Sequence, residues 1–168
     1  MADKFLTIGS GGDIEEVEAT VTSAGAGDAG EVVALDAAGK LDTSVMPSGI
    51  GVDEVTIPFT ETAAAGNLIN IFDDSGTAKA RLADASNGRV AHGYAPSAVT
   101  QPASGAVRFE GEITGLTSKS IGVKQFLGTS GTLTETAPTT STHTLQVVGY
   151  ARDATTVDFE PAQGITRA

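Results

Sequence analysis

The sequence lacks cysteine and tryptophan, and only 5% of its 168 residues are aromatic. The absence of cysteine excludes disulfide bonds, thiolate nucleophiles and cysteine-based metal sites. The fold therefore needs no oxidising compartment, and synthesis in a cytoplasm is expected. With two tyrosines and no tryptophan, the chain also has little material for the aromatic platform on which sugar-binding proteins stack their ligands.

Long hydrophobic runs and basic clusters are missing as well. No segment approaches the length of a membrane-spanning helix, and the first six residues contain no signal-peptide core. The formal net charge is −11; residues 1–60 hold eleven acidic and two basic side chains, and residues 61–168 hold ten and eight. Because an acidic chain repels phosphate groups, neither a nucleic acid nor a membrane is expected as a partner.

Glycine and β-branched residues are plentiful, with 21 glycines in the chain. Short β-branched runs separated by glycine-containing turns are typical of an all-β fold, here a small β-barrel or sandwich. The small side chains predict a thin core and further burial on oligomerisation. The strands expected after residue 54 are 55–59, 68–72, 78–82, 90–94, 105–110, 123–127, 132–136, 145–151 and 156–160.

The first third of the chain has a different pattern. Residues 16–22 alternate between polar and apolar types and favour a strand over a helix, and the glycine-rich residues 9–12 are interpreted as a linker. A hairpin is expected around a turn that ends at Gly39, and residues 46–51 interrupt the chain again. The predicted organisation is an extended N-terminal arm (1–24), a linker and β-hairpin segment (25–57) and a β-barrel domain (58–168).

An internal repeat is the most informative pattern in the sequence. A stretch that begins at Gly66 is followed downstream by Gly93-Tyr94-Ala95, and a similar stretch that begins at Gly122 is followed by Gly149-Tyr150-Ala151. Both pairs of equivalent positions are 56 residues apart. The pattern predicts two duplicated hairpin units that bury apolar surface against each other.

Residues that could support catalysis or metal binding are few. The two histidines, His92 and His143, have no carboxylate at a supporting spacing, and the residues after Asp73 lack the ligand series of a calcium loop. Glu110 and Glu112 could form a glycosidase pair, but no aromatic sugar platform accompanies them. The sequence contains no nucleophile elbow around a serine. We therefore expect no enzymatic activity, no cofactor and no metal.

An acidic cluster occurs near the N-terminus and consists of Asp13, Glu15, Glu16 and Glu18. Two interpretations of this cluster stay open. It is either a docking surface or cation site, or a solvated strand edge. Charge on an edge strand protects it against aggregation, which favours the second interpretation.

Three segments resemble sequences of tailed-bacteriophage structural proteins. Residues 30–47, GEVVALDAAGKLDTSVMP, resemble a phrase that recurs in these proteins. Residues 65–79, AGNLINIFDDSGTAK, followed by residues 91–95, AHGYA, are similar to the capsid decoration (cement) family. Residues 146–161 resemble the closing strands of the same proteins, so the similarity spans most of residues 25–161.

The resemblance implies a homotrimeric β-domain on the outer surface of an icosahedral capsid, made in the cytoplasm of a bacterial host. The major capsid protein and further copies of this chain are the implied partners. The N-terminal arm would then order on a neighbouring subunit or on the capsid. Its expected contact residues are the apolar ones, namely Phe5, Leu6, Ile8, Ile14 and Val17.

Two alternatives stay open. A tail-fibre, collar or other tail structural protein is the first, because the phrase GKLDTSVMP also occurs in fibres, although this chain has no long repetitive shaft. A β-sandwich carbohydrate-binding module is the more remote one.

Overall fold

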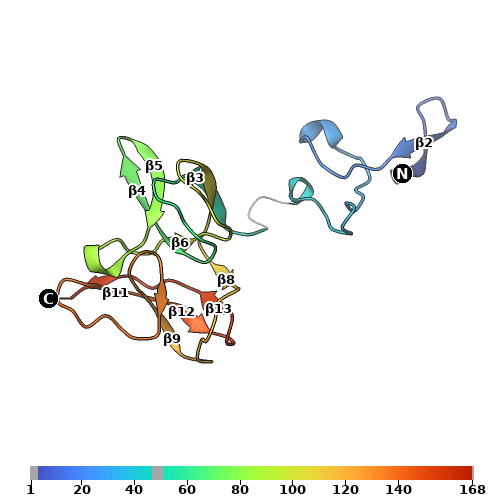
Figure 1. Cartoon of the computed structure of the whole chain (residues 1–168). Coiled ribbons are helices and arrows are strands. Elements are labelled where there is room, and N and C mark those ends of the chain that lie inside the picture. The colour runs from blue at the N-terminus through green and yellow to red at the C-terminus, as the bar shows by residue number, and fades with distance from the viewer. Residues whose placement is uncertain (1–3, 47–50, 168) are drawn as a thin grey trace. The chain divides into compact units, whose positions relative to one another are not determined.

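The computed structural model describes residues 4–46 and 51–167. Nearly all of its regular structure is β, which confirms the predicted all-β class. The sheets are open and sandwich-like, and within the described ranges no sheet closes into a barrel. The chain divides into two units, Met1–Gly51 and Val52–Ala168 (Figure 1), whereas the boundaries predicted after residues 24 and 57 stay predictions. Among the described residues, the helices are all too short to cross a membrane.

The first unit begins with an antiparallel hairpin formed by β1 (Lys4–Ile8) and β2 (Ile14–Glu18). In its turn the amide of Gly9 donates to the carbonyl of Asp13, and Gly12 has a φ of +89° that favours glycine. The interpretation of residues 9–12 as a linker was therefore wrong. Linkers and tight turns share a glycine-rich composition, and only the two short strands on either side distinguish them.

The rest of the first unit has little regular structure beyond the short 3-10 helices η1 (Ala26–Asp28) and η2 (Thr43–Val45). The expected turn at Gly39 is present, because the amide of Gly39 donates to the carbonyl of Asp36 over 2.9 Å. The strands expected beside this turn are not formed, since only an isolated bridge between Thr20 and Val33 occurs there. Residues 47–50 of the predicted chain break lie outside the described residues.

The second unit contains two five-stranded sheets, whose strands are coloured from teal to red in Figure 1. The first sheet has the order β5-β4-β6-β7-β3 and consists of β3 (Glu54–Pro58), β4 (Leu68–Asp74), β5 (Thr77–Leu82), β6 (Gly93–Tyr94) and β7 (Ser104–Arg108). The second has the order β10-β9-β12-β13-β8 and consists of β8 (Gly111–Ile113), β9 (Lys124–Leu127), β10 (Leu133–Thr134), β12 (Val147–Ala151) and β13 (Val157–Phe159). A separate short pair joins β11 (Thr144–Leu145) to β14 (Ile165–Thr166).

The two large sheets have the same topology, which confirms the duplicated hairpin units predicted from the sequence. If the five strands of each sheet are numbered one to five in chain order, both sheets have the spatial order three, two, four, five, one. Tyr94 pairs with Leu68 on one side and with Arg108 on the other. Tyr150 occupies the equivalent position in the second sheet, between Lys124 and Asp158.

The expected strand 132–136 is formed only at Leu133–Thr134. Two other predicted strands are shortened or divided because polar groups interrupt their ladders. Of the expected strand 90–94 only Gly93–Tyr94 is formed, and the His92 side chain instead accepts the amide of Ile71. The expected strand 145–151 is divided at Gln146, whose side chain hydrogen-bonds the backbone of Ala91 and Ala162. A side chain that pairs with backbone in this way competes with regular strand pairing.

Alternation along the strands gives each sheet two distinct faces. In the first sheet, Leu68 and Tyr94 point to one side, and Ile69 and Val107 point to the other. The Tyr94 side packs in one core with Val157 and its neighbours from the second sheet, and the rings of Tyr94 and Phe159 meet edge to face at 5.3 Å. The opposite side, around Val107, forms a second core within the first repeat.

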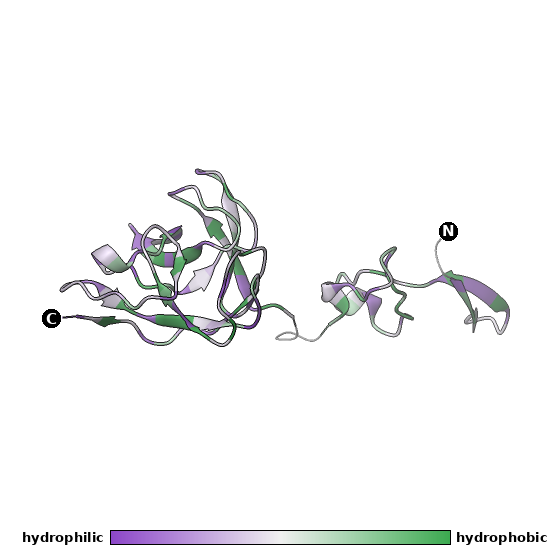
Figure 2. Cartoon of the chain, turned by 60° about the horizontal axis from the view of Figure 1, so that its bottom comes forward, coloured by the Kyte–Doolittle hydropathy of each residue, from purple (hydrophilic) through white to green (hydrophobic). Residues whose placement is uncertain are grey.

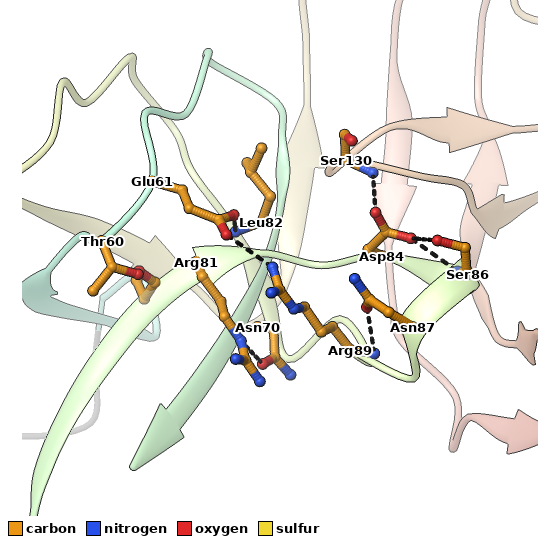
Figure 3. A network of polar contacts seen from close by, with 11 residues as sticks. Thr60, Glu61, Asn70, Arg81, Leu82, Asp84, Ser86, Asn87, Arg89 and Ser130 are labelled. Atoms are coloured by element: carbon orange, nitrogen blue, oxygen red, sulfur yellow. Dashed lines mark hydrogen bonds and ion pairs between the residues drawn. The ribbon is translucent and has the colours of Figure 1, made fainter. Parts of the chain in front are cut away.

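A polar network around Asp84 joins the two repeats (Figure 3). One carboxylate oxygen of Asp84 accepts the amide and the hydroxyl of Ser86 in its own repeat, and the other accepts the amide of Ser130 at 3.0 Å in the second repeat. Partial burial by itself would raise the pKa of Asp84, but these hydrogen bonds outweigh it and hold that pKa below its usual value. The ionised carboxylate is thus the form that ties the repeats together.

Replacing Asp84 by alanine is expected to lower the free energy of unfolding by about 2 kcal/mol, because three donors lose a charged acceptor. Since the pKa is lower in the folded state, this stabilisation is present above the unfolded pKa of about 4 and is lost as the pH falls through the folded value. Urea unfolding of both proteins at pH 7 and pH 3 measures it, with Glu160→Ala as the exposed control. An equal difference at the two pH values would contradict the assignment.

Candidate functional site

The first unit contains no buried residue among its described positions 4–46, in contrast to the second unit with its two apolar cores. Hydrophobic and hydrophilic residues alternate along this part of the chain (Figure 2). A segment of this length without a fully buried side chain gains little hydrophobic stabilisation by itself. Its apolar side chains are therefore the first candidates for contact with another molecule.

The five predicted contact residues all lie in the β1–β2 hairpin, but the strand register separates them onto two faces. Phe5 pairs with Val17 on one face, where both side chains are half-buried. Leu6, Ile8 and Ile14 lie on the other face and are 70%, 75% and 75% exposed. The hairpin thus brings three of the predicted residues into one exposed aliphatic cluster, while the contact role of all five stays a prediction.

Charged side chains lie beside Leu6 and at the open end of the hairpin, on one side of this aliphatic cluster. Lys4 and Glu16 lie on the same face and form an ion pair with an N–O distance of 2.5 Å. Glu18 pairs with Lys4 across the strands and also lies on this face, whereas Glu15 lies on the opposite one. The acidic cluster predicted from the sequence is therefore divided between the two faces of the hairpin.

A second group of exposed aliphatic residues was not predicted from the sequence. Each is about half exposed, and all occur in or beside the phrase that resembles phage proteins: Val32, Val33, Leu35 and Leu41. The sequence signal that could have identified them is their position on both sides of the short turn that ends at Gly39. A turn of this length brings too few residues together to bury them. They add exposed apolar residues to the first unit outside the hairpin.

The polar residues of the same phrase stabilise its own backbone. The carboxylate of Asp36 accepts the amides of Ala38 and Lys40, and that of Asp42 accepts the amide of Ser44 at the start of η2. Hydrogen bonds from Ser44 lower the pKa of Asp42. These residues are turn and cap residues, which explains why aspartate recurs in the phrase and leaves the aliphatic residues for contacts.

A groove of about 740 Å³ lies in the second unit, where residues of both repeats meet. Its lining includes Ile71, Phe109 and Pro161, together with His92. The Nδ1 atom of His92 accepts the amide of Ile71 at 2.9 Å, and burial lowers the pKa of the imidazole, so His92 is neutral at pH 7. The groove presents a mainly apolar surface with one imidazole and two amide side chains, Gln146 and Gln163, and its lining includes no carboxylate.

The remaining candidate residues have structural roles. Glu112 forms an ion pair with Arg152 at 2.7 Å, and the same guanidinium pairs with Asp158. Asp73 accepts the amide of Gly76 in the β4–β5 turn, as the turn interpretation predicted. Across the described ranges, no three residues with metal-ligating side chains gather in one place. The expectation that the chain uses no metal or cofactor stays a prediction.

Comparison with known proteins finds two matching chains among solved structures. No protein-family model matches the chain, and no curated protein matches it. A solved structure described as the head fiber gp8.5 N base in bacteriophage phi29 aligns with 66% of this chain and 95% of that chain. The sequence identity is 15% and the TM-score is 0.48, a level of similarity that supports no functional argument.

Proposed function

We propose that this chain is a non-enzymatic structural protein of a bacteriophage virion, and specifically a head decoration protein that binds the outer capsid surface as a homotrimer. In this role the Val52–Ala168 unit is a rigid body and the Met1–Gly51 unit attaches it to the shell. Contacts that cross capsomer boundaries stabilise the capsid, because each one repeats at every symmetry-related position. No cofactor takes part.

The observation that carries this proposal is the lack of any buried residue in positions 4–46, combined with the aliphatic side chains exposed there. A segment of this kind is expected to bury its apolar surface on a partner. The resemblance of residues 30–47 to the phage phrase supports a virion as the setting. The net charge of −11 supports a position outside the shell, away from packaged DNA.

A tail-fibre or collar protein is the second candidate, favoured by the same phrase. Cryo-electron microscopy of virions of the phage that encodes the chain tests both proposals. Density in three-fold clusters over the head lattice is the result expected for a decoration protein. Density confined to the tail would favour the second candidate, and absence from the particle would overturn both. The mass of the purified chain in solution tests the trimer separately.

A further inference from the structure

One face of the β1–β2 hairpin combines exposed aliphatic side chains with charged ones and carries one more carboxylate than ammonium groups. The register puts Leu6, Ile8 and Ile14 on one face, and each is at least 70% exposed. Glu16 and Glu18 lie on that face as well, together with Lys4, which pairs with Glu16 and leaves Glu18 as the excess carboxylate. A partner that covers this face must therefore desolvate aliphatic groups and accommodate an excess negative charge at the same time.

The charge of the hairpin is not balanced internally. Residues 4–18 contain four carboxylates and one ammonium group, that of Lys4, which is already paired with Glu16. Carboxylates at the edge of an apolar contact favour a partner whose rim carries cations, because like charges placed opposite each other weaken association. Electrostatic complementarity thus selects among the possible occupants of this face.

A second copy of this chain offers few free cations for that purpose. Residues 52–168 hold twelve acidic and eight basic side chains. Four of the eight, Lys79, Arg89, Arg108 and Arg152, pair with carboxylates of the same unit. A fifth, Arg81, lies over the ring of Phe72 at 4.2 Å. Residues 1–51 add only two more basic side chains, against nine acidic ones.

We infer that the Leu6–Ile8–Ile14 face of the hairpin docks into an apolar depression rimmed by lysine or arginine side chains on a different protein. This inference rests on the proposed function, in which that protein is the major capsid protein. The opposite face, with Phe5 and Val17, remains part of the hairpin itself and faces away from the shell. The attachment is thus both hydrophobic and electrostatic, and it weakens as salt screens the carboxylates.

Binding of the full-length chain to purified heads that lack it tests this inference, with NaCl varied from 50 to 300 mM. The affinity of the wild-type chain is expected to fall about tenfold over this range. The double variant Glu16→Gln and Glu18→Gln is expected to bind about tenfold more weakly at 50 mM and to lose most of the salt dependence. The isosteric control Glu15→Gln, on the opposite face, is expected to stay within about twofold of wild type.

A second double variant tests the contribution of the aliphatic side chains to binding. Replacing Ile8 and Ile14 by serine is expected to weaken binding about 100-fold at every salt concentration, whereas Ile165→Ser, at a 66% exposed position of the second unit, has no effect. Circular dichroism confirms that each variant is folded. An affinity of the carboxylate variant equal to or above that of wild type overturns the cationic rim.

The remaining outcomes show whether the docking inference or the proposed decoration function has failed. If the wild type binds heads and all hairpin variants bind equally well, the inference fails and the proposed function stands. If the variants change the mass of the chain in solution instead of head binding, the occupant is a second copy, and the inference again fails. If the wild type does not bind heads at all, the proposed function itself is overturned.

Discussion

Replacing Leu68 by aspartate is expected to prevent folding of the Val52–Ala168 unit. Leu68 is fully buried in the core shared by the two repeats, and its amide donates to the carbonyl of Gly131 at 2.8 Å. A carboxylate at this position would lose its water without gaining a partner, and the cost would exceed the whole stability of an ordinary domain. The milder variant Leu68→Ala is expected to cost about 3 kcal/mol through the cavity it leaves.

Circular dichroism during heating and limited proteolysis measure this effect. Ile121→Asp is the matched control, because Ile121 is 72% exposed and the same substitution there is expected to change stability little. Ile71→Asp should have an intermediate effect, since Ile71 is only half-buried. A cooperative unfolding transition of Leu68→Asp at the temperature of the wild type would contradict the assigned core.

Deleting residues 2–18 is expected to abolish attachment to capsids while the second unit remains folded. The deletion removes the whole hairpin, including the Leu6, Ile8 and Ile14 cluster, and it removes no residue of either core. A shorter deletion that ends at residue 12 would leave β2 without its partner strand, so a loss of binding could then reflect a misfolded remnant. Removal at a strand boundary avoids that ambiguity.

Co-sedimentation of the truncated chain with heads that lack the protein measures the loss, and the thermal transition of the second unit provides the control. The expected result is unbound chain with an unchanged transition. Saturation of the heads by the truncated chain would exclude the hairpin as the attachment element. The exposed residues Val32, Val33, Leu35 and Leu41 would then be the next candidates.

The duplicated sheets were predictable because their turns carry strong local signals. Ser75 and Gly76 form the β4–β5 turn with φ angles of +57° and +86°, and Ser130 and Gly131 do the same after β9 with +50° and +75°. The β4–β5 loop consists of its two residues alone, whereas the loop after β9 contains its pair within residues 128–132. Positive φ angles at such a pair favour a hairpin turn. The identical spacing of the two copies along the sequence then predicts a repeated unit.

The ends of strands and the exposed site were less predictable, because both depend on contacts between distant residues. The break at Gln146 requires Ala91, which is 55 residues away, to approach its side chain. The register of β1 and β2 requires a turn whose glycines look like a linker in the sequence. The prediction identified the apolar residues of the hairpin but could not determine that Leu6 lies on one face and Phe5 on the other.

The Tyr94 side of the first sheet packs against the Val157 side of the second. These two sides are not equivalent in the repeat, because Tyr150, the counterpart of Tyr94, lies on the other side of its sheet from Val157. A unit that presents both surfaces can in principle add further units at either end, so such packing leads to open-ended stacks unless growth is blocked. In this chain both ends are blocked. Phe59, Ala63 and Val99 cover the outer side of the first sheet. On the outer side of the second sheet, Lys124 takes the position that Leu68 has in the first, in a row with Tyr150, Asp158 and Glu112. The two repeats thus form a stack of two members, whose outer sides lack the surfaces that join the repeats to each other.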